Sequence, residues 1–354
     1  MRRPRLKTTT EVFSSPGGGL CLLRPSADCD LVLEGAGERG RELIGRIDGR
    51  SSVAALEAEF GAEAVGELLA LLAAEDLVED ASDYDALAAA ERGRYDRQLR
   101  YFADVAPAGL SAPACQRRLR GAHVMVLGVG GLGTWSALSL ACCGVGRLTL
   151  VDGDTVELSN LNRQVLYSEE DIGRAKATVA AQALERFNPG VRVVPVARTL
   201  GTRAEIAAAV RGSSLVVDAA DRPAHDIERW VNAACFAHGV PYITMSHFPP
   251  YARVGPLYVP GETGCFNCQE LAYRRSYELY DHIVDQRRGA PSPAATLGPV
   301  CAFVGGQVAL DVVHHLTGIC APASRGTVRI FDTRTLTVSE EAVPRDPLCE
   351  VCST

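Results

Sequence analysis

The sequence predicts an α/β protein whose main part is a doubly wound, mostly parallel sheet, and three observations support this. From residue 122 onward, short apolar runs alternate with helical stretches, as in consecutive βαβ units. A glycine-rich turn, GVGGLG at Gly128–Gly133, joins the first such run to a helical stretch. Residues 18–80 instead indicate two strands and three short helices. We therefore expect a Rossmann-like domain over residues 86–354 and a small winged-helix-like α+β domain over residues 1–85.

Composition and charge exclude several classes of protein. The chain has 354 residues, 47% of them hydrophobic, and a formal net charge of −7. An acidic chain has no overall positive field to attract nucleic acid. The sequence contains no run of 18 apolar residues, and its basic N-terminus lacks the apolar segment of a secretory signal. We expect a cytoplasmic protein with no nucleic-acid partner and no membrane segment.

The small domain begins with a predicted hairpin. Leu20–Arg24 and Cys29–Leu33 are short apolar runs separated by Pro-Ser-Ala-Asp, which is typical of two paired strands. Three helices follow. We place the first at residues 37–47, the second from a cap at Ser51 or Ser52 to Gly61, and the third across a stripe formed by Val65, Leu68, Leu69 and Leu72. The Ala- and acid-rich stretch Asp80–Arg92 is expected to be a linker.

The large domain is expected to start near Arg94 and to alternate strands with helices. The predicted strands are Val124–Leu127, Arg147–Val151, Val191–Val196 and Leu215–Val217, and the predicted helices between them are Leu132–Cys143 and Ala175–Phe187. Cys142 and Cys143 fall in the apolar part of a helix, so we expect them in the core. The Pro-, Ala- and Arg-rich stretch Gln286–Thr296 is expected to form a mobile loop.

The glycine-rich turn is a candidate phosphate-binding site. Where Cβ atoms are absent the backbone can approach a phosphate closely, and the helix start that follows favours an anion. We assign nucleotide binding to Gly128, Gly130, Gly131 and Gly133. The sequence VDGD then places Asp152 at a strand end and Asp154 just beyond it, where an acidic group can bind a ribose hydroxyl. A nicotinamide-dependent dehydrogenase has the same two features.

The next motifs favour adenylyl transfer over hydride transfer. ELSNLNRQ contains Asn160, Arg163 and Gln164, and GRAK contains Lys176. Fixed cations stabilise the charge that develops on the phosphates when a carboxylate attacks ATP, whereas a dehydrogenase does not need them there. The sequence VDAADR then places Asp221 near a strand end, where it can hold Mg²⁺ against the phosphates.

Two C-x₂-C pairs indicate a metal site. The chain has 12 cysteines, and the paired ones are Cys265, Cys268, Cys349 and Cys352. Four thiolates bind Zn²⁺ tetrahedrally and leave no open position, so such a zinc ion is structural. It would also tie the C-terminal tail to the domain. Two disulfides or a redox pair are the alternatives.

Taken together, the motifs from about Arg94 to Cys352 resemble those of the ThiF/MoeB/HesA adenylyltransferases, relatives of the ubiquitin-activating enzymes. The matching sequences are RYDRQ, GVGGLG, the region of Asp152, LSNLNRQ, GRAK, DAAD and the C-x₂-C pairs. The resemblance implies ATP at the residues named above and Mg²⁺ at Asp221. In the family the second Arg of RYxRQ reaches the ATP of the neighbouring subunit, which implies this role for Arg97 and a homodimer.

Three positions differ from the family pattern. Arg222 follows the metal-binding Asp where Asn is common, and Trp135 follows the glycine-rich turn where a small residue is usual. Sulfur-carrier activators often have a cysteine in the loop before the final helix, but the corresponding Gly289–Gly298 contains none. The nearest thiol, Cys301, lies in an apolar run and is expected in the core. Thioester or persulfide chemistry is therefore not predicted.

The N-terminal domain suggests the substrate. Its strand pair and three helices resemble the PqqD-like domains that bind precursor peptides as an added strand. Residues 18–80 contain 14 Asp or Glu, five Arg and no Lys, which argues against DNA binding by a winged helix. The combination of the two domains resembles the enzymes that adenylate ribosomally made peptides, of which the microcin C adenylating enzyme is one. A simple dimerisation or packing domain is the alternative.

The main hypothesis is thus ATP-dependent adenylation of a carboxylate or amide on a ribosomally made precursor peptide, with release of pyrophosphate. Catalysis is assigned to Arg97, Arg163, Lys176 and Asp221, and a downstream tailoring enzyme is a possible partner. The adenylate can proceed to a phosphoramidate, an amide or a cyclised product. The loop around Tyr273–Thr296 is expected to cover the peptide. Alternatives are activation of a sulfur carrier ending in Gly-Gly, a leader-presenting scaffold for a cyclodehydratase, and a dehydrogenase.

Overall fold

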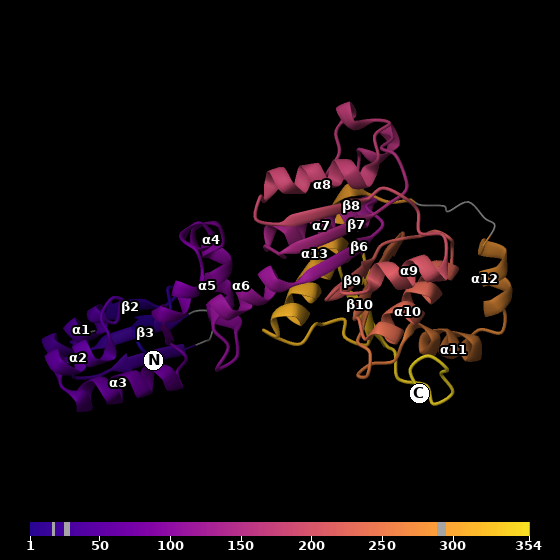
Figure 1. Ribbon diagram of the computed structural model, residues 1–354. Helices are drawn as coiled ribbons and strands as arrows, with labels where there is room; N and C mark the ends of the chain where they lie inside the picture. The colour runs from indigo at the N-terminus through magenta and orange to yellow at the C-terminus, as the bar shows by residue number, and fades with distance from the viewer. Residues whose placement is uncertain (16–17, 25–28, 289–294, 354) are drawn as a thin grey trace. The chain divides into compact units, whose positions relative to one another are not determined.

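The chain folds into two compact units. The computed structural model describes residues 1–15, 18–24, 29–288 and 295–353, and the units are Met1–Arg117 and Arg118–Thr354. Figure 1 shows the first in indigo and purple and the second from purple to yellow. The boundary falls within helix α6 (Ala112–Gly121). A functional division after residue 85 stays a prediction.

The first unit combines small antiparallel sheets with helices. Strands β2, β3 and β4 form one sheet in that order, and β1 pairs with β5 in another. The elements are β1 (Pro4–Leu6), β2 (Glu11–Ser14), β3 (Leu20–Arg24), β4 (Cys29–Leu33), α1 (Gly37–Arg46), α2 (Val53–Phe60), α3 (Ala62–Ala74), β5 (Val78–Asp80), a 3₁₀ turn at Ala81–Ala86, α4 (Ala89–Arg94) and α5 (Asp96–Val105).

The predicted hairpin and the three predicted helices of this unit are confirmed. Strands β3 and β4 pair antiparallel, and the side chain of Ser52 caps α2 by accepting the N–H of Ala55 at 3.2 Å. The sheet and the helices share one core, in which Leu22, Leu56 and Leu72 are fully buried. Because each element presents only one apolar face, neither the hairpin nor the helices can bury it without the other.

The predicted linker at Asp80–Arg92 is wrong, because this stretch is structured. Asp80 accepts the N–H of Ser82 at 2.9 Å and starts the 3₁₀ turn. The hydroxyl of Tyr84 donates to Glu79 at 2.9 Å, and the guanidinium of Arg5 lies 4.3 Å from the centre of its ring. The anchor Arg5 is distant in sequence, so composition alone indicated a flexible segment.

The three-stranded sheet presents apolar side chains on its outer face. Phe13, Cys21 and Val32 are in register across β2, β3 and β4, and Phe13 and Val32 are each 50% exposed. Within the part of the chain that the structure describes, β2 and β4 each have one unpaired edge. The sheet therefore offers both an apolar face and open backbone groups.

The second unit is built on an eight-stranded sheet with the order β13-β12-β11-β10-β9-β6-β7-β8. Strands β8, β7, β6, β9 and β10 are parallel, and β11, β12 and β13 continue the sheet antiparallel. The strands are β6 (His123–Leu127), β7 (Arg147–Val151), β8 (Arg192–Val196), β9 (Leu215–Asp218), β10 (Tyr242–Phe248), β11 (Tyr251–Tyr258), β12 (Thr327–Asp332) and β13 (Val338–Ala342). The predicted doubly wound, mostly parallel architecture is confirmed.

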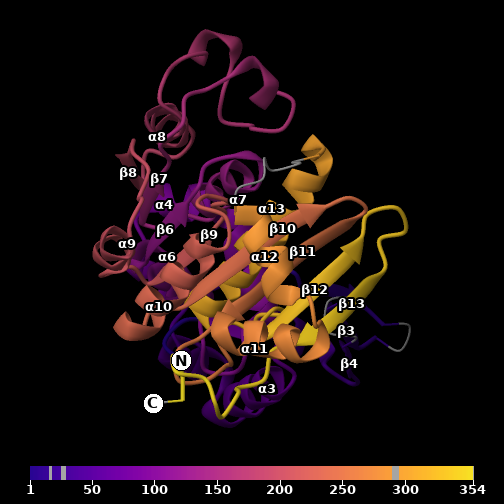
Figure 2. The same cartoon turned by 90° about the vertical axis from the view of Figure 1, so that its right-hand side faces the viewer.

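Helices cover both faces of this sheet, as Figures 1 and 2 show. Helices α7, α8 and α13 lie on one face and α9 and α10 on the other, because the chain crosses over in the opposite direction after β8. The helices are α7 (Gly131–Cys142), α8 (Lys176–Phe187), α9 (Arg203–Val210), α10 (Asp226–His238), α11 (Phe266–Ser276), α12 (Tyr280–Arg288) and α13 (Gly298–Thr317). The carboxyl ends of β6, β7 and β9, where the winding direction of the sheet reverses, carry the predicted nucleotide motifs.

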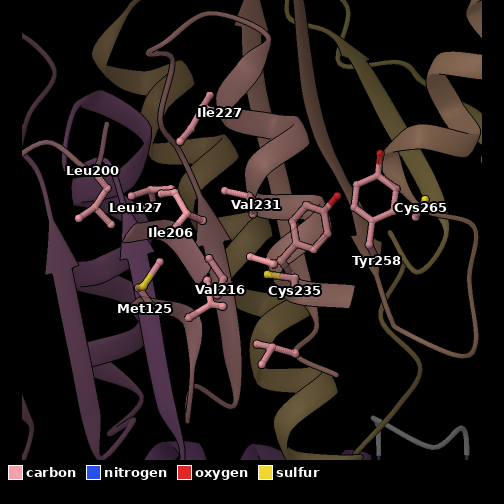
Figure 3. Packing of buried hydrophobic residues seen from close by; sticks show 14 of the residues in the cluster. Met125, Leu127, Leu200, Ile206, Val216, Ile227, Val231, Cys235, Tyr258 and Cys265 are labelled. Atoms are coloured by element: carbon pink, nitrogen blue, oxygen red, sulfur yellow. The ribbon is translucent and has the colours of Figure 1, made fainter. Parts of the chain in front are cut away.

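A large core lies between the sheet and α9 and α10. Figure 3 shows Met125 and Val216 from the strands packing against side chains of both helices. Towards Cys265 the core continues into a stacked pair, Tyr242 and Tyr258, whose rings are 4.8 Å apart. The buried Asn232 accepts the hydroxyl of Tyr242 at 2.9 Å and the N–H of Phe266 at 3.0 Å. The core therefore fixes the first residues of α11.

The two adjacent cysteines at the end of α7 are not both in the core as predicted. Cys142 is exposed and Cys143 is half-buried. The helix ends there, and the chain turns through Gly144 at φ 77°, so the apolar stripe of α7 no longer faces the sheet at these positions. Cys301, in contrast, is buried as predicted. The expected loop Gln286–Thr296 is wrong at its start, because residues 286–288 form the end of α12. Residues 289–294 lie outside the described residues.

Helix α13 packs closely against α7. By length and composition it is the one described helix that qualifies as a membrane span, but half of it is buried inside the unit and it contacts α7, β10 and β11. A Cβ atom on Gly305 would lie 2.6 Å from the Cβ of Trp135. The neighbouring Gly306 has nothing within 4 Å of the same position. Of these two neighbouring glycines, Gly305 is therefore the one that the helix contact requires.

Two adjacent substitutions test this contact. Gly305→Ala should lower the free energy of unfolding by about 1–3 kcal/mol, because the added methyl group overpacks the interface. Gly306→Ala should raise it by about 0.5–1 kcal/mol, because alanine favours the helix. Urea unfolding followed by circular dichroism measures both. Equal effects of the two substitutions would contradict the close packing of α7 on α13.

Candidate active site

The glycine-rich turn between β6 and α7 forms a cradle that side chains would fill. A Cβ on Gly133 would lie 2.0 Å from the carbonyl oxygen of Gly128, and one on Gly128 would lie 2.7 Å from that of Ala219. Gly128 also has φ 87°, which favours glycine. At Gly130 the nearest atom, the amide nitrogen of Gln164, would be 3.9 Å away, so this position is not crowded. No side chain caps the start of α7, so its amides suit a phosphate.

Asp152 ties the end of β7 to this turn. Its carboxylate accepts the N–H of Val129 and the N–H of Asp154, both at 2.8 Å. Burial raises the pKa of Asp152, while these two hydrogen bonds act in the opposite direction. On the other side, the hydroxyl of Tyr167 donates to the carbonyl of Val129 at 2.8 Å. The turn is thus fixed from both sides before any ligand binds.

Lys176 lies at the first turn of α8 and is almost fully buried. Its ammonium group forms an ion pair with Asp154 at 2.9 Å, and its backbone N–H donates to the carbonyl of Asp154 at the same distance. Asp154 itself is largely exposed. Because the ammonium group is already buried and its carboxylate partner is exposed, Lys176 can exchange Asp154 for a phosphate at small cost in desolvation.

A tight turn at Asn160–Gln164 brings the remaining predicted residues to the glycines. The N–H groups of Arg163 and Gln164 both donate to the carbonyl of Asn160, at 3.1 and 3.0 Å. The Cγ and Cδ atoms of Arg163 pack over Gly131. Gln164 is buried, its amide nitrogen faces Gly130, and its Oε1 has no partner among the described residues. An orphaned acceptor beside the cradle fits a bound polar ligand.

The end of β9 carries two acids in different environments. Asp221 is exposed, as suits a carboxylate that holds Mg²⁺. Asp218 is buried, its Oδ1 accepts the N–H of Ala220 at 3.3 Å, and its Oδ2 has no partner within the described chain. Burial, with the nearby charge of Glu228, raises the pKa of Asp218 to about 8. Asp218 is a further acid at this edge that the motifs do not single out, although it ends the apolar strand β9.

Arg97 and Cys301 are two further residues that the sequence singles out. Arg97 lies on α5 of the first unit, where its side chain is 85% exposed and 3.7 Å from Asp96. Cys301 lies next to the glycine turn, since a Cβ on Gly131 would be 2.9 Å from its sulfur. The hydroxyl of Thr296 is 3.2 Å from the same sulfur. Burial raises the pKa of the Cys301 thiol, which keeps it in the protonated form at neutral pH.

The four paired cysteines converge as predicted. Their sulfur atoms all lie within 4.8 Å of one another, with Cys265 at 3.4 Å from Cys349 and Cys268 at 3.3 Å from Cys352. Four ligands at about 2.3 Å from a tetrahedral zinc ion stand roughly 3.8 Å apart, so the cluster fits this metal. The side chain of Asn267 donates to the sulfur of Cys349. The site lies beside Tyr258 at the margin of the core (Figure 3).

Comparison with known proteins decides the family. The family model described as ThiF matches residues 95–351. The chain belongs to the ThiF family. It is 36% identical over 259 residues to the sulfur carrier protein ThiS adenylyltransferase of Escherichia coli (strain K12), a match that covers 73% of this chain and 94% of that protein. ThiF-family relatives of this kind show that the chain is an ATP-dependent adenylyltransferase.

Two solved structures extend the comparison over the whole chain. The crystal structure of E. coli MccB with ATP is 25% identical, with a TM-score of 0.75, and the match covers 99% of this chain and 100% of that one. The structure of the microcin C7 biosynthetic enzyme MccB with N-formylated MccA is 26% identical, with the same TM-score and coverage. The predicted resemblance to these enzymes is confirmed at the level of fold and adenylation.

Removal of the cysteine cluster should release one zinc ion and destabilise the second unit. Cys349→Ser leaves three thiolates and a weaker site, so metal content measured by atomic emission should fall and the thermal midpoint should drop. Cys320→Ser, at an exposed cysteine outside the cluster, is the matched control and should change neither value. Full zinc content in Cys349→Ser would contradict this site.

Stability should also depend on the protonation of Asp218. The pKa of this group rises from 3.8 when exposed to about 8 when folded, so its stabilising contribution is complete below pH 4 and is lost as the pH rises to 8. Asp218→Asn removes this dependence. The variant should therefore gain stability relative to the wild type between pH 5 and about 8, measured by urea unfolding at a series of pH values. Parallel curves would show that Asp218 ionises normally.

Proposed function

We propose that this adenylyltransferase activates a carboxylate or amide group on a ribosomally made precursor peptide, during the biosynthesis of a peptide natural product. The supporting observation is the extent of the match to MccB. That match covers 99% of this chain, whereas the ThiF family match begins at residue 95 and leaves residues 1–94 unmatched. MccB is in complex with N-formylated MccA, its precursor peptide, in one of the matching structures. Because this chain matches MccB over both units, we infer that it acts on the same class of substrate.

The first unit is suited to bind an extended peptide. Its three-stranded sheet has open edges at β2 and β4, where a peptide can add as a further strand through main-chain hydrogen bonds. The exposed Phe13 and Val32 offer apolar contacts on the outer face of the same sheet. Residues 18–80 are strongly acidic, which favours a leader peptide with basic residues.

In the second unit the peptide carboxylate attacks the α-phosphate of ATP, a P–O bond forms, and pyrophosphate leaves. The amides at the start of α7 and the uncrowded position at Gly130 receive phosphates, and Arg163 and Lys176 stabilise the charge that develops on them. Asp152 and Asp154, with Asn160 and Gln164 nearby, hold the nucleoside. Asp221 would hold Mg²⁺, which supplies further charge neutralisation when bound.

The proposal includes the oligomeric state and the cellular location of the enzyme. A cytoplasmic homodimer places Arg97 of the partner subunit at the phosphates, which fits an exposed arginine that lacks a strong ion pair of its own. A separate tailoring enzyme then takes the activated peptide.

Activation of a sulfur carrier is the second candidate function. The 36% identity to the ThiS adenylyltransferase supports it. However, Gly289–Gly298 contains no cysteine that could form a thioester or persulfide. In addition, the match to the ThiS adenylyltransferase covers 73% of this chain and leaves about a quarter of it unmatched. The match to MccB, which supports a peptide substrate, therefore accounts for more of the chain than the match to the carrier activator.

The test is peptide-dependent release of AMP and pyrophosphate. The protein is incubated with Mg²⁺-ATP and either the product of a short reading frame beside its gene or a carrier protein ending in Gly-Gly. We expect pyrophosphate release with the peptide, and none when its leader is removed. Release with the carrier alone would overturn the proposal in favour of the second candidate.

Variants of one motif provide the internal control. Lys176→Ala removes the buried cation, so ATP binding should weaken by about 10- to 100-fold, the range expected for one charge-assisted hydrogen bond. Arg174→Ala changes an exposed arginine two residues away, which pairs with Asp171, and should leave ATP binding unchanged. Calorimetry with Mg²⁺-ATP measures both. Equal affinities in the two variants would exclude Lys176 from the nucleotide site.

A further inference from the structure

Trp135 occupies an unusual place between two helices and the nucleotide site. It lies one helical turn after Gly131 on α7, and its Cβ faces the bare backbone of Gly305 on α13. Because a side chain at residue 305 would collide with it, the two helices fix the position of Trp135. The side chain therefore starts from a fixed point between the two helices.

The polar end of this ring reaches the Asn160–Gln164 turn. The indole Nε1–H of Trp135 donates to the carbonyl oxygen of Arg163 at 3.2 Å, across 28 residues of sequence. The aliphatic part of Arg163 packs over Gly131, on the same helix as Trp135. Helix α7 thus contacts both the backbone and the side chain of this arginine.

The guanidinium of Arg163 is oriented by neighbours in the same turn. Its NH1 atom donates to the carbonyl of Ser159 at 2.8 Å and to the side chain of Asn162 at 3.1 Å. The start of α13 limits the turn on another side, since a Cβ on Gly298 would lie 2.7 Å from the carbonyl of Asn162. Any shift of the Arg163 backbone would therefore move its charged group away from Gly131.

We propose that Trp135 is a positioning residue that holds Arg163 at the ATP phosphates through its indole hydrogen bond. The inference rests on the proposed role of Arg163 in binding ATP. A small side chain at position 135 leaves the Arg163 carbonyl without this donor and removes the volume of the ring. Phenylalanine keeps an aromatic ring at this position but cannot donate.

A double-mutant cycle separates this role from simple packing. Trp135→Phe keeps the Cβ that packs at Gly305 and an aromatic ring beyond it, and removes the donor, so its thermal midpoint should stay close to that of the wild type. Its affinity for Mg²⁺-ATP, measured by calorimetry, should fall about fivefold, equivalent to one hydrogen bond of about 1 kcal/mol. In a protein that already carries Arg163→Ala, the same substitution should change the affinity less than twofold.

Each other outcome overturns the inference. An equal loss in the Arg163→Ala background would mean that Trp135 acts through packing alone. Unchanged affinity in Trp135→Phe, or in Arg163→Ala alone, would mean that there is nothing for the indole to position. These results are independent of the proposed substrate, because the titration uses ATP without peptide. Failure of peptide-dependent pyrophosphate release would instead overturn the proposed function and leave the cycle interpretable.

Discussion

The nucleotide end of the second unit depends on how closely backbone can approach backbone around α7. Gly133 lies on the carbonyl of Gly128, Gly128 lies on that of Ala219, and Gly305 lies against Trp135. Together these contacts fix the start of α7 relative to β6, β9 and α13. The phosphate cradle, the turn that carries Arg163 and the strand end that carries Asp221 all take their positions from this one helix. A methyl group at any of the three glycines would displace several of these parts at once.

The parallel half of the sheet could be predicted from sequence because its signals are local. The strand Arg147–Val151 was predicted with its correct bounds, and α8 begins one residue after the predicted start at Ala175. The antiparallel extension from β11 to β13 was not predicted, because β11 pairs with β12 from a distant part of the chain and none of these strands has a motif of its own. The stretch after Asp80 was mistaken for a linker for the same reason, since its anchor Arg5 is remote.

The sequence predicts which residues make up the candidate site but not how their side chains contact one another. Motifs placed Asp152 after a strand and Lys176 at a helix start, with Arg163 in the connection between them, and fold rules bring such positions to one edge of the sheet. Two further features required coordinates. The indole of Trp135 meets Arg163 only because α7 and α13 fix it there, and Asp218 differs from Asp221 only in its burial. Residue type and spacing do not reveal which of two neighbouring acids lacks water.

The burial of Asp218 has a consequence for the field that an approaching nucleotide meets. The same edge of the sheet gathers Asp152, Asp154 and Asp221, whose negative charges repel a polyphosphate. With a pKa of about 8, Asp218 is mainly protonated in neutral solution and adds little to this repulsion. It also presents a hydroxyl that can donate, where an ionised carboxylate can only accept. From the sequence alone, Asp218 looks unfavourable for binding an anion. Because it is buried and mainly protonated, it is compatible with fast nucleotide association.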